Sequence, residues 1–289
     1  MKLFGVLLAG LAVAVSGVAQ QQAFGHRADG AQVPLMVYGQ AMQGASCSPL
    51  VVLSHGAGGS ERGYEYLAAG LAGKGWFVIV MGHRESGREA MVKDIRQARS
   101  LRDGVQELVS TPSAYEARIG DTGAALEWAG AQCKAKQAPF RALVGHSMGA
   151  ETVLLEAGAK NSLGLRGAGM DRFDAYVAMS PQGAGNVFPK GAWNGLHKPV
   201  FDLTGTKDEA PQGGPTWRQE PYAGLPGAGS CDWLGVIDGA THMSFAGRGP
   251  DTDRINGEIV TAVSSFLEGA RRHKCVLPPA IPGFLLRSK

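Results

Sequence analysis

The pentapeptide Gly145-His146-Ser147-Met148-Gly149 is the feature that most constrains the fold of this chain. The apolar run of residues 140–144 comes directly before it, and residues 150–157 read as a helix. A serine between a strand and a helix, with glycine two positions away on each side, predicts a sharp turn that exposes its hydroxyl. The chain holds 43 glycines, so the pattern alone is expected by chance on the order of 0.4 times. The flanking strand and helix make the prediction specific.

Residues 1–19 predict an export signal and no part of the fold. Lys2 precedes an apolar stretch from Leu3 to Val15, and the small residues 16–19 follow it. A charged start, an apolar run too short to span a bilayer and a small-residue cleavage point are typical of a signal peptide. We expect cleavage after Ala19 and a mature protein in the periplasm or outside the cell. A membrane anchor is the alternative interpretation of this segment.

The remaining residues, 20–289, are enough for a single large α/β domain with a substantial core. The formal net charge of +3 falls by one, to +2, when Lys2 leaves, which is too small to indicate a nucleic-acid partner. No second apolar run could cross a membrane, so we expect no lasting membrane association after removal of the signal. Nothing in the sequence specifies an oligomeric state.

The cysteines Cys47, Cys133, Cys231 and Cys275 show no C-x-x-C spacing. This makes a zinc site or a thioredoxin-like redox site a poor interpretation. In an oxidising compartment an even number of cysteines favours disulfides, here two. The count alone leaves three pairings open.

Strands and helices alternate along most of the chain. Buried strands, apolar on both faces, are expected at residues 50–53, 76–81, 142–144, 175–179, 200–204 and 233–237. Helices are expected at 64–74, 91–109 and 253–273, and an antiparallel edge strand at 33–38. This alternation predicts an α/β fold with a mostly parallel sheet and helices on both faces.

Two segments rich in glycine and proline, residues 182–197 and 211–229, interrupt this alternation. Each follows an expected strand, at the end where α/β sheets bind ligands. We interpret them as loops over a binding site, with ordinary surface loops as the alternative. Their aromatic residues Trp193, Trp217 and Tyr222 are candidate substrate contacts, although an aromatic residue in a loop is as often a packing anchor.

Ser147 has a candidate base and a candidate acid in the order that nucleophilic catalysis uses. Asp208 lies just past the strand expected at 200–204, and His242 just past the strand expected at 233–237. The order serine, aspartate, histidine, each at the end of a successive strand, is typical of α/β hydrolases. His242 would take the proton of the serine hydroxyl and deliver it to the leaving group, and Asp208 would orient the imidazole. Asp202 and Glu209 are the alternative acids.

A glycine-rich loop, Ser54-His55-Gly56-Ala57-Gly58-Gly59, follows the strand expected at 50–53. Such a loop brings a backbone N–H close to a developing oxyanion, and the residue after the nucleophile supplies the second donor. We expect the N–H groups of Ala57 and Met148 to form this oxyanion hole. A phosphate-binding loop is the alternative, but its closing lysine and hydroxyl residue are absent. We expect His55, Gly56 and His146 to line the substrate site.

Together these residues resemble the serine α/β hydrolases, and among them the esterases related to dienelactone hydrolase and to bacterial platelet-activating-factor acetylhydrolase-like proteins. The matching segments are His55-Gly56-Ala57-Gly58-Gly59, Gly82-His83, Gly145 to Gly149, Gly205-Thr206-Lys207-Asp208 and Gly239-Ala240-Thr241-His242. Dienelactone hydrolase itself has a cysteine nucleophile where this chain has Ser147, so the resemblance implies ordinary carboxylic esters as substrates. The family topology also implies the disulfides Cys47–Cys133 and Cys231–Cys275.

The sequence therefore predicts an exported hydrolase that cleaves small-molecule carboxylic esters through an acyl-enzyme on Ser147, without a metal or another cofactor. A lipase or polyester hydrolase is the nearest alternative, and the lack of a long apolar lid segment favours short-chain substrates. Peptidase, thioesterase and amidase reactions use the same groups. An alternative of another class is a binding protein that keeps the hydrolase fold without catalysis.

Overall fold

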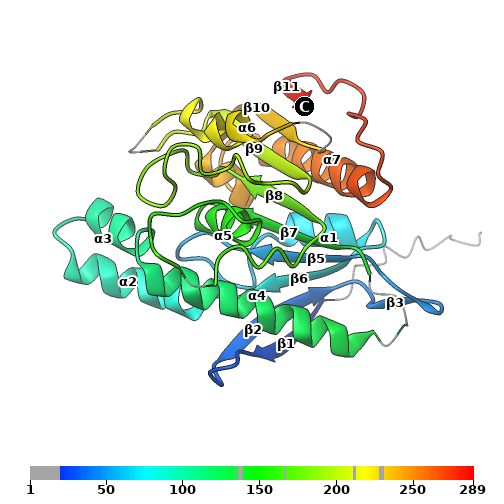
Figure 1. The fold of residues 1–289 in the computed structure, drawn as a ribbon, viewed down its shortest axis with the longest axis horizontal. Helices are drawn as coiled ribbons and strands as arrows, with labels where there is room; N and C mark the ends of the chain where they lie inside the picture. Colours follow the sequence, from blue (N-terminus) through cyan, green and yellow to red (C-terminus); the bar gives the residue numbers. More distant parts are fainter. Residues whose placement is uncertain (1–19, 134, 136–138, 166, 211–212, 228–230) are drawn as a thin grey trace, which may run out of the picture.

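A nine-stranded sheet forms the centre of the computed structural model, which describes residues 20–289 apart from 134, 136–138, 166, 211–212 and 228–230 (Figure 1). The expected signal peptide lies outside the described residues. Along the sheet the strands are β1 (Gln20–His26), β2 (Gln32–Tyr38), β6 (Phe77–Met81), β5 (Leu50–Ser54), β7 (Arg141–His146), β8 (Ala175–Met179), β9 (Val200–Lys207), β10 (Trp233–Thr241) and β11 (Phe284–Ser288). A separate hairpin pairs β3 (Met42–Gln43) with β4 (Ser46–Cys47).

The six central strands, from β6 to β10, are parallel to one another. Every residue of β5, β6 and β8 is buried, as the continuous apolar runs predict for strands covered on both faces. The expected α/β fold with a mostly parallel sheet is therefore confirmed. The carboxyl ends of these strands meet at one edge of the sheet, where the candidate residues lie.

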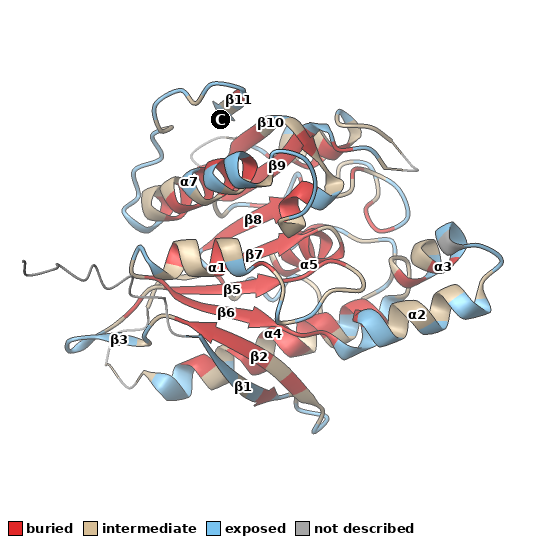
Figure 2. Cartoon of the chain, turned by 180° about the vertical axis from the view of Figure 1, so that it is seen from behind, coloured by how far each residue is buried: buried red, intermediate tan, exposed pale blue. Residues whose placement is uncertain are grey.

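Helices cover both faces of the sheet. Their bounds are α1 Glu65–Ala72, α2 Arg88–Gln97, α3 Leu101–Leu108, α4 Pro112–Gln132, α5 Met148–Glu156, α6 Glu220–Gly224 and α7 Thr252–Arg271. Figure 2 shows α1 and α7 over one face, and Figure 1 shows α4 and α5 over the other. Each face has its own apolar core, one including Trp233 and Phe266 and the other including Tyr115 and Phe188.

Both edges of the sheet are antiparallel. The edge strand expected at residues 33–38 is present as β2, but β1 pairs outside it and forms the true edge. At the opposite edge β11 pairs with β10. Neither β1 nor β11 was expected from the sequence.

The single helix expected at residues 91–109 is instead a pair of helices, α2 and α3, that project from the body (Figure 1). Ala98 ends α2 in an extended conformation, and the hydroxyl of Ser100 accepts a hydrogen bond from the N–H of Asp103, which starts α3. A side chain at Gly104 would lie 2.6 Å from the Cα of Ile95. The close contact between the two helices therefore depends on glycine.

The two disulfides join Cys47 to Cys133 and Cys231 to Cys275, with Cα–Cα distances of 5.7 and 5.4 Å. Both pairings agree with those implied by the family topology. The first joins the end of β4 to the residue that follows α4, and the second joins the segment just before β10 to the segment after α7. Each links residues far apart in sequence at the end of the sheet opposite the candidate site.

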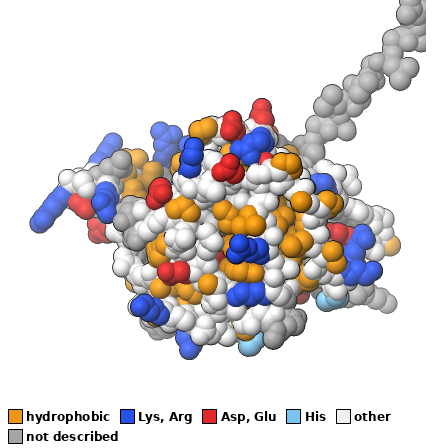
Figure 3. Space-filling model, turned by 90° about the horizontal axis from the view of Figure 1, so that it is seen from above, with side chains coloured by type: hydrophobic (Ala, Val, Ile, Leu, Met, Phe, Trp, Pro, Cys, Tyr) orange, Lys and Arg blue, Asp and Glu red, His pale blue; other side chains and the backbone are white. Residues whose placement is uncertain are grey.

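Within the described residues, none of the helices combines the length and the apolar character that crossing a membrane requires. On the face shown in Figure 3, lysine and arginine side chains lie among acidic and apolar ones and do not form one continuous tract.

Candidate active site

Ser147 is the first residue after β7 and stands in a backbone conformation that non-glycine residues rarely adopt, with φ 54° and ψ −126°. A side chain at Gly149 would overlap the carbonyl oxygen of Ser54, and one at Gly145 would overlap the carbonyl oxygen of Gly149. The two glycines are therefore what allows α5 to turn back sharply over the sheet. The serine itself is partly exposed, whereas its neighbours on both sides are buried.

The register between β9 and β10 brings His242 and Asp208 together. Lys207 pairs with Thr241, the last residue of each strand, so the next residue along each strand leaves the sheet beside the other. The Nε2 atom of His242 lies 3.0 Å from the Oγ of Ser147, and its Nδ1 atom lies 3.3 Å from Oδ1 of Asp208. The three residues thus form one connected serine–histidine–aspartate chain.

The carboxylate of Asp208 is fully buried and fully bonded. Thr204 donates to Oδ2 at 2.9 Å, Ser180 donates to Oδ1 at 2.9 Å, and the guanidinium of Arg218 lies 2.7 Å from Oδ1. These donors fix the position of the carboxylate beside the imidazole.

The two alternative acids lie elsewhere. Asp202 is buried inside β9, where its Oδ2 accepts a hydrogen bond from the N–H of Tyr222, and burial raises its pKa well above the usual range. Glu209 is exposed. Among the described contacts, only Asp208 supplies a carboxylate to His242.

The glycine-rich loop after β5 lies against the nucleophile. A side chain at Gly56 would come within 3.2 Å of the Cβ of Ser147. Within the described part of the chain, no hydrogen-bond acceptor is recorded for the N–H of Ala57 or for the N–H of Met148, which begins α5. Two donors without an acceptor in the described structure meet one requirement of an oxyanion hole.

Tyr64 connects this loop to the nucleophile turn. Its hydroxyl accepts a hydrogen bond from the N–H of Gly56 at 3.2 Å and lies 2.7 Å from Nδ1 of His146. His146 in turn contacts the carbonyl oxygen of His242 through Nε2, at 2.9 Å. Since the hydroxyl can donate to Nδ1, one tyrosine links the loop, the turn and the base.

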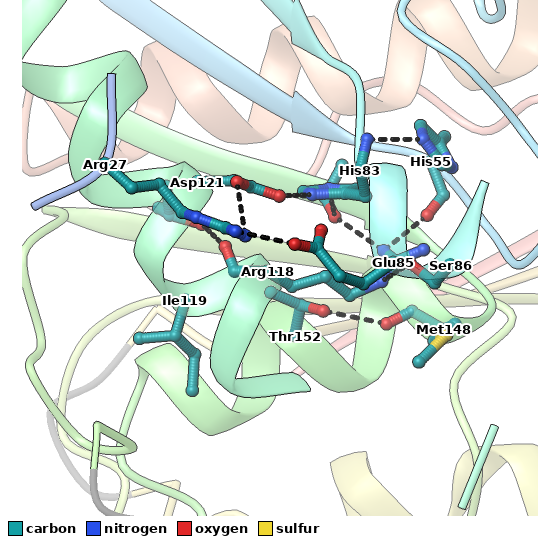
Figure 4. A network of polar contacts seen from close by, with 12 residues as sticks. Arg27, His55, His83, Glu85, Ser86, Arg118, Ile119, Asp121, Met148 and Thr152 are labelled. Atoms are coloured by element: carbon teal, nitrogen blue, oxygen red, sulfur yellow. Dashed lines mark hydrogen bonds and ion pairs between the residues drawn. The ribbon is translucent and has the colours of Figure 1, made fainter. Parts of the chain in front are cut away.

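Behind the loop lies a buried polar network centred on Arg118, from the middle of α4 (Figure 4). Its guanidinium donates to the carbonyl oxygen of His55 at 2.7 Å and to the hydroxyl of Ser54 at 3.2 Å. The same hydroxyl lies 2.8 Å from Nε2 of His83, and Nδ1 of His83 lies 2.8 Å from Asp121. Burial raises the pKa of Asp121 to about 7 and lowers that of His83 well below its usual value.

Three of the expected substrate contacts are covered by protein. Trp193 is 2% exposed and packs against Phe188 in the core. His55 is fully buried and accepts a hydrogen bond from the N–H of His83, while His146 is 3% exposed. As a correction, we drop these three as substrate contacts, because none has surface to offer a ligand.

The other two expected contacts, Gly56 and Trp217, have different surroundings: Gly56 lies against the Cβ of Ser147, and Trp217 comes from the second of the two loops. Trp217 is partly exposed and donates from Nε1 to the carbonyl oxygen of Ala184, which ties together the two loops that were expected over the site. Tyr222 instead packs under the ammonium of Lys289, 4.6 Å from its ring. Part of the second loop, residues 211–212 and 228–229, lies outside the described residues.

Several polar residues around the site were not singled out from the sequence, namely Ser180, Arg218, Tyr64, Arg118 and Asp121. Ser180 carried a usable signal, because it directly follows the strand expected at 175–179, as Ser147 follows its own strand. Arg218 comes from the short 3₁₀ helix Trp217–Gln219 and Arg118 comes from α4, and neither segment carried such a signal.

Glu151, one turn into α5, is fully buried beneath this region. Its Oε1 accepts a hydrogen bond from the N–H of Gln182 at 2.8 Å, and within the described structure its Oε2 has no partner. Burial raises the pKa of this carboxyl to about 8. Burial therefore favours the protonated form of Glu151.

A family model described as the alpha/beta hydrolase family matches residues 51–276, most of the chain. The chain belongs to the alpha/beta hydrolase family. No curated protein matches its sequence significantly.

Solved structures agree with this assignment. A protein described as a dienelactone hydrolase from Klebsiella pneumoniae superposes with a TM-score of 0.60 at 17% identity, over 86% of this chain and 99% of that one. A Pyrococcus furiosus esterase gives 0.55 at 16%, over 87% and 92%. An acylaminoacyl peptidase from Pyrococcus horikoshii gives 0.64 at 12%, over 88% of this chain and 42% of that one. At these identities the likeness establishes the shared fold.

Proposed function

We propose that the protein is an exported serine hydrolase that cleaves carboxylic esters through an acyl-enzyme on Ser147. The observation that carries the proposal is the 3.0 Å contact between Nε2 of His242 and the hydroxyl of Ser147. That hydroxyl stands at a strained turn between two glycines, and a buried carboxylate lies behind the imidazole. A base within hydrogen-bond reach of an exposed serine is what nucleophilic catalysis requires.

The reaction follows from this arrangement. Nε2 of His242 takes the proton of Ser147 as Oγ attacks the ester carbonyl carbon, and the carbonyl oxygen becomes an oxyanion bound by the N–H groups of Ala57 and Met148. The imidazolium then gives its proton to the leaving alcohol, which departs and leaves an acyl group on the serine. Water repeats the steps, with His242 as base and then as acid, and releases the carboxylic acid. Asp208 stabilises the imidazolium in both halves.

Carboxylic esters are the substrate class that the motifs favour, because a serine nucleophile stands where dienelactone hydrolase has cysteine. The similar solved structures include a protein described as an esterase, which supports this choice at the level of the fold. Export to the periplasm or beyond is supported by the signal-like N-terminus and by two disulfides, since disulfides persist in oxidising compartments.

The proposal is tested by replacing the nucleophile. Ser147→Ala should fold normally but lose p-nitrophenyl ester hydrolysis by about 10³-fold or more, leaving only what binding and the oxyanion donors contribute. Ser265→Ala, on α7 at the other end of the sheet, is the matched control and should keep full activity. A fluorophosphonate probe should label the control at Ser147 and leave the variant unlabelled. Turnover by Ser147→Ala at the control rate would refute the proposal.

Substrate length is measured with the same protein. Comparing p-nitrophenyl acetate with long-chain p-nitrophenyl esters separates an esterase of short substrates from a lipase. Preference for the long chains would replace the esterase with the lipase alternative.

A further inference from the structure

Ser180 lies closer to the candidate base than the candidate acid does. Its Oγ is 2.7 Å from Nδ1 of His242 and 2.9 Å from Oδ1 of Asp208, whereas Nδ1 and Oδ1 are themselves 3.3 Å apart. Ser180 is fully buried. Beside the direct contact, a second hydrogen-bonded path from the imidazole to the carboxylate therefore passes through this hydroxyl, and each of its two contacts is shorter than the direct one.

The backbone holds Ser180 in place at an energetic cost. Its φ is 55°, and it directly precedes Pro181. A positive φ is uncommon for a non-glycine residue, and a following proline restricts the backbone further. Such strain persists where the surrounding structure imposes it, and it concentrates at functional sites.

The sheet register explains how the hydroxyl reaches the base. His146 pairs with Met179, so Ser147 and Ser180 are the first residues to leave two neighbouring strands. The N–H of Ser180 then bonds to the carbonyl oxygen of Leu203 on β9, at 2.6 Å. Ser180 is thus fixed between the strand that precedes the nucleophile and the strand that precedes Asp208.

Arg218 contacts both Asp208 and the backbone of Ser180 and Pro181. Its guanidinium is buried and lies 2.7 Å from Oδ1 of Asp208, and its Nη1 donates to the carbonyl oxygens of Ser180 and Pro181 at 2.9 and 3.0 Å. One cation therefore fixes both the carboxylate and the backbone that carries the hydroxyl. Its Nη2 also lies 3.1 Å from Nδ1 of His242.

The direction of the hydrogen bonds follows from what each group can do. For Nε2 of His242 to accept the proton of Ser147, Nδ1 must carry the ring hydrogen. Arginine has no acceptor, so the nearest acceptor for that hydrogen is the hydroxyl of Ser180. The hydroxyl then points its own hydrogen at Asp208.

We propose that Ser180 is a positioning residue that connects His242 to Asp208, with its hydroxyl accepting from Nδ1–H and donating to the carboxylate, while Arg218 holds both partners. This inference rests on the proposed hydrolase function. No proton leaves Nδ1: the proton of Ser147 goes to Nε2 and then to the leaving group, and the hydroxyl transmits the stabilising charge. In this scheme the imidazolium of His242 interacts with the carboxylate of Asp208 mainly through the hydroxyl of Ser180.

The test is a double-mutant cycle on p-nitrophenyl acetate with Ser180→Gly, Asp208→Asn and the double variant. Glycine suits a positive φ, so Ser180→Gly removes the hydroxyl without straining the backbone. We expect a fall in kcat of about 10- to 100-fold, the value of a hydrogen bond to a charged group, with KM unchanged. Asp208→Asn should lower kcat by about 10³-fold or more. The double variant should lie within about twofold of Asp208→Asn, because the hydroxyl acts through the carboxylate.

The matched control is His273→Gly, which makes the same backbone change at an exposed residue with φ 54° and should leave kcat unaltered. Ser180→Ala is the second variant, and circular dichroism is used to check that it folds. It should reproduce the loss in kcat. A Ser180→Gly enzyme within twofold of the wild type would overturn the inference, and so would losses that multiply in the double variant. Either result leaves the hydrolase proposal standing if Ser147→Ala remains inactive, so the two failures are distinguishable.

Discussion

The buried carboxyl of Glu151 should lower the free energy of unfolding of this protein as the pH rises, and Glu151→Gln should remove that contribution. In the folded state the carboxyl has no counter-ion within hydrogen-bond distance among the described residues, and burial raises its pKa from 4.5 to about 8. The unfolded chain loses this proton near the lower value. Between the two pKa values the folded state therefore holds one more proton than the unfolded state.

The sign and the size follow from linkage. Since the folded state binds the extra proton, the free energy of unfolding decreases with rising pH across this interval and levels off above it. One unit of pKa shift corresponds to about 1.4 kcal/mol, so the change from pH 5 to pH 9 amounts to about 4 kcal/mol. Glutamine is neutral at every pH and keeps the oxygen that accepts from Gln182. The variant should therefore gain about 4 kcal/mol relative to the wild type over this range.

Urea unfolding of both proteins at pH 5 and pH 9 measures the difference directly. Other buried carboxyls, such as Asp121 and Asp202, contribute to the slope of each curve but cancel in the comparison. Glu116→Gln, an exposed carboxylate on α4, is the control and should follow the wild type at both pH values. Parallel curves for Glu151→Gln and the wild type would refute the reasoning, because they would mean that Glu151 is ionised in the folded protein.

Three further changes should have separable effects. Gly149→Ala places a side chain against the carbonyl oxygen of Ser54. This variant should lose ester hydrolysis, and its free energy of unfolding should fall by about 1–3 kcal/mol. An active and stable variant would contradict the account of the turn. Replacing Cys231 and Cys275 by serine opens a loop with a sequence separation of 44. The free energy of unfolding, measured in urea, should fall by about 4 kcal/mol. An unchanged free energy of unfolding would mean that the disulfide does not form. Tyr64→Phe leaves the buried N–H of Gly56 without its acceptor. The free energy of unfolding should fall by about 1–3 kcal/mol, and kcat should also fall. Unchanged turnover would show that the tyrosine supports no reacting group.

The sheet was predictable because its strands carry an unambiguous signal. Each of the six central strands contains a mainly apolar run, which Asp202 interrupts in β9 and Gly235 interrupts in β10. Two strands extend further than their apolar cores indicate, since β9 continues through Gly205-Thr206-Lys207 and β10 through Thr241. Their pairing with each other stabilises these polar ends, which a pattern of apolar residues does not reveal.

The sequence patterns did not predict α4, the longest of the described helices, because its buried face is partly polar. It buries Arg118, Asp121 and Thr122 as well as apolar residues such as Tyr115, so no apolar stripe marks its inner face. The polar network under the oxyanion loop required those side chains at positions where a helix normally places apolar ones. β1 and β11 were missed because they are edge strands of mixed composition whose pairing is set by distant residues.

The residues expected to form the triad are those that the fold brings together, because chain order and strand ends constrain them strongly. The substrate contacts were harder to predict. Whether Trp193 lines a pocket or fills the core depends on the path of an irregular loop, and that path is set by long-range packing against Phe188 and its neighbours.

Ser54, His83 and Asp121 give the protein a second serine–histidine–aspartate chain, with both links at 2.8 Å. A template search that ranks catalytic sites by interatomic spacing would place this trio ahead of the one at the sheet edge, whose links are 3.0 and 3.3 Å. Yet no ester can reach Ser54, which is fully buried, and the environment of His83 opposes the positive charge that a base must carry. In this molecule solvent access, more than spacing, therefore distinguishes the proposed nucleophile Ser147 from Ser54.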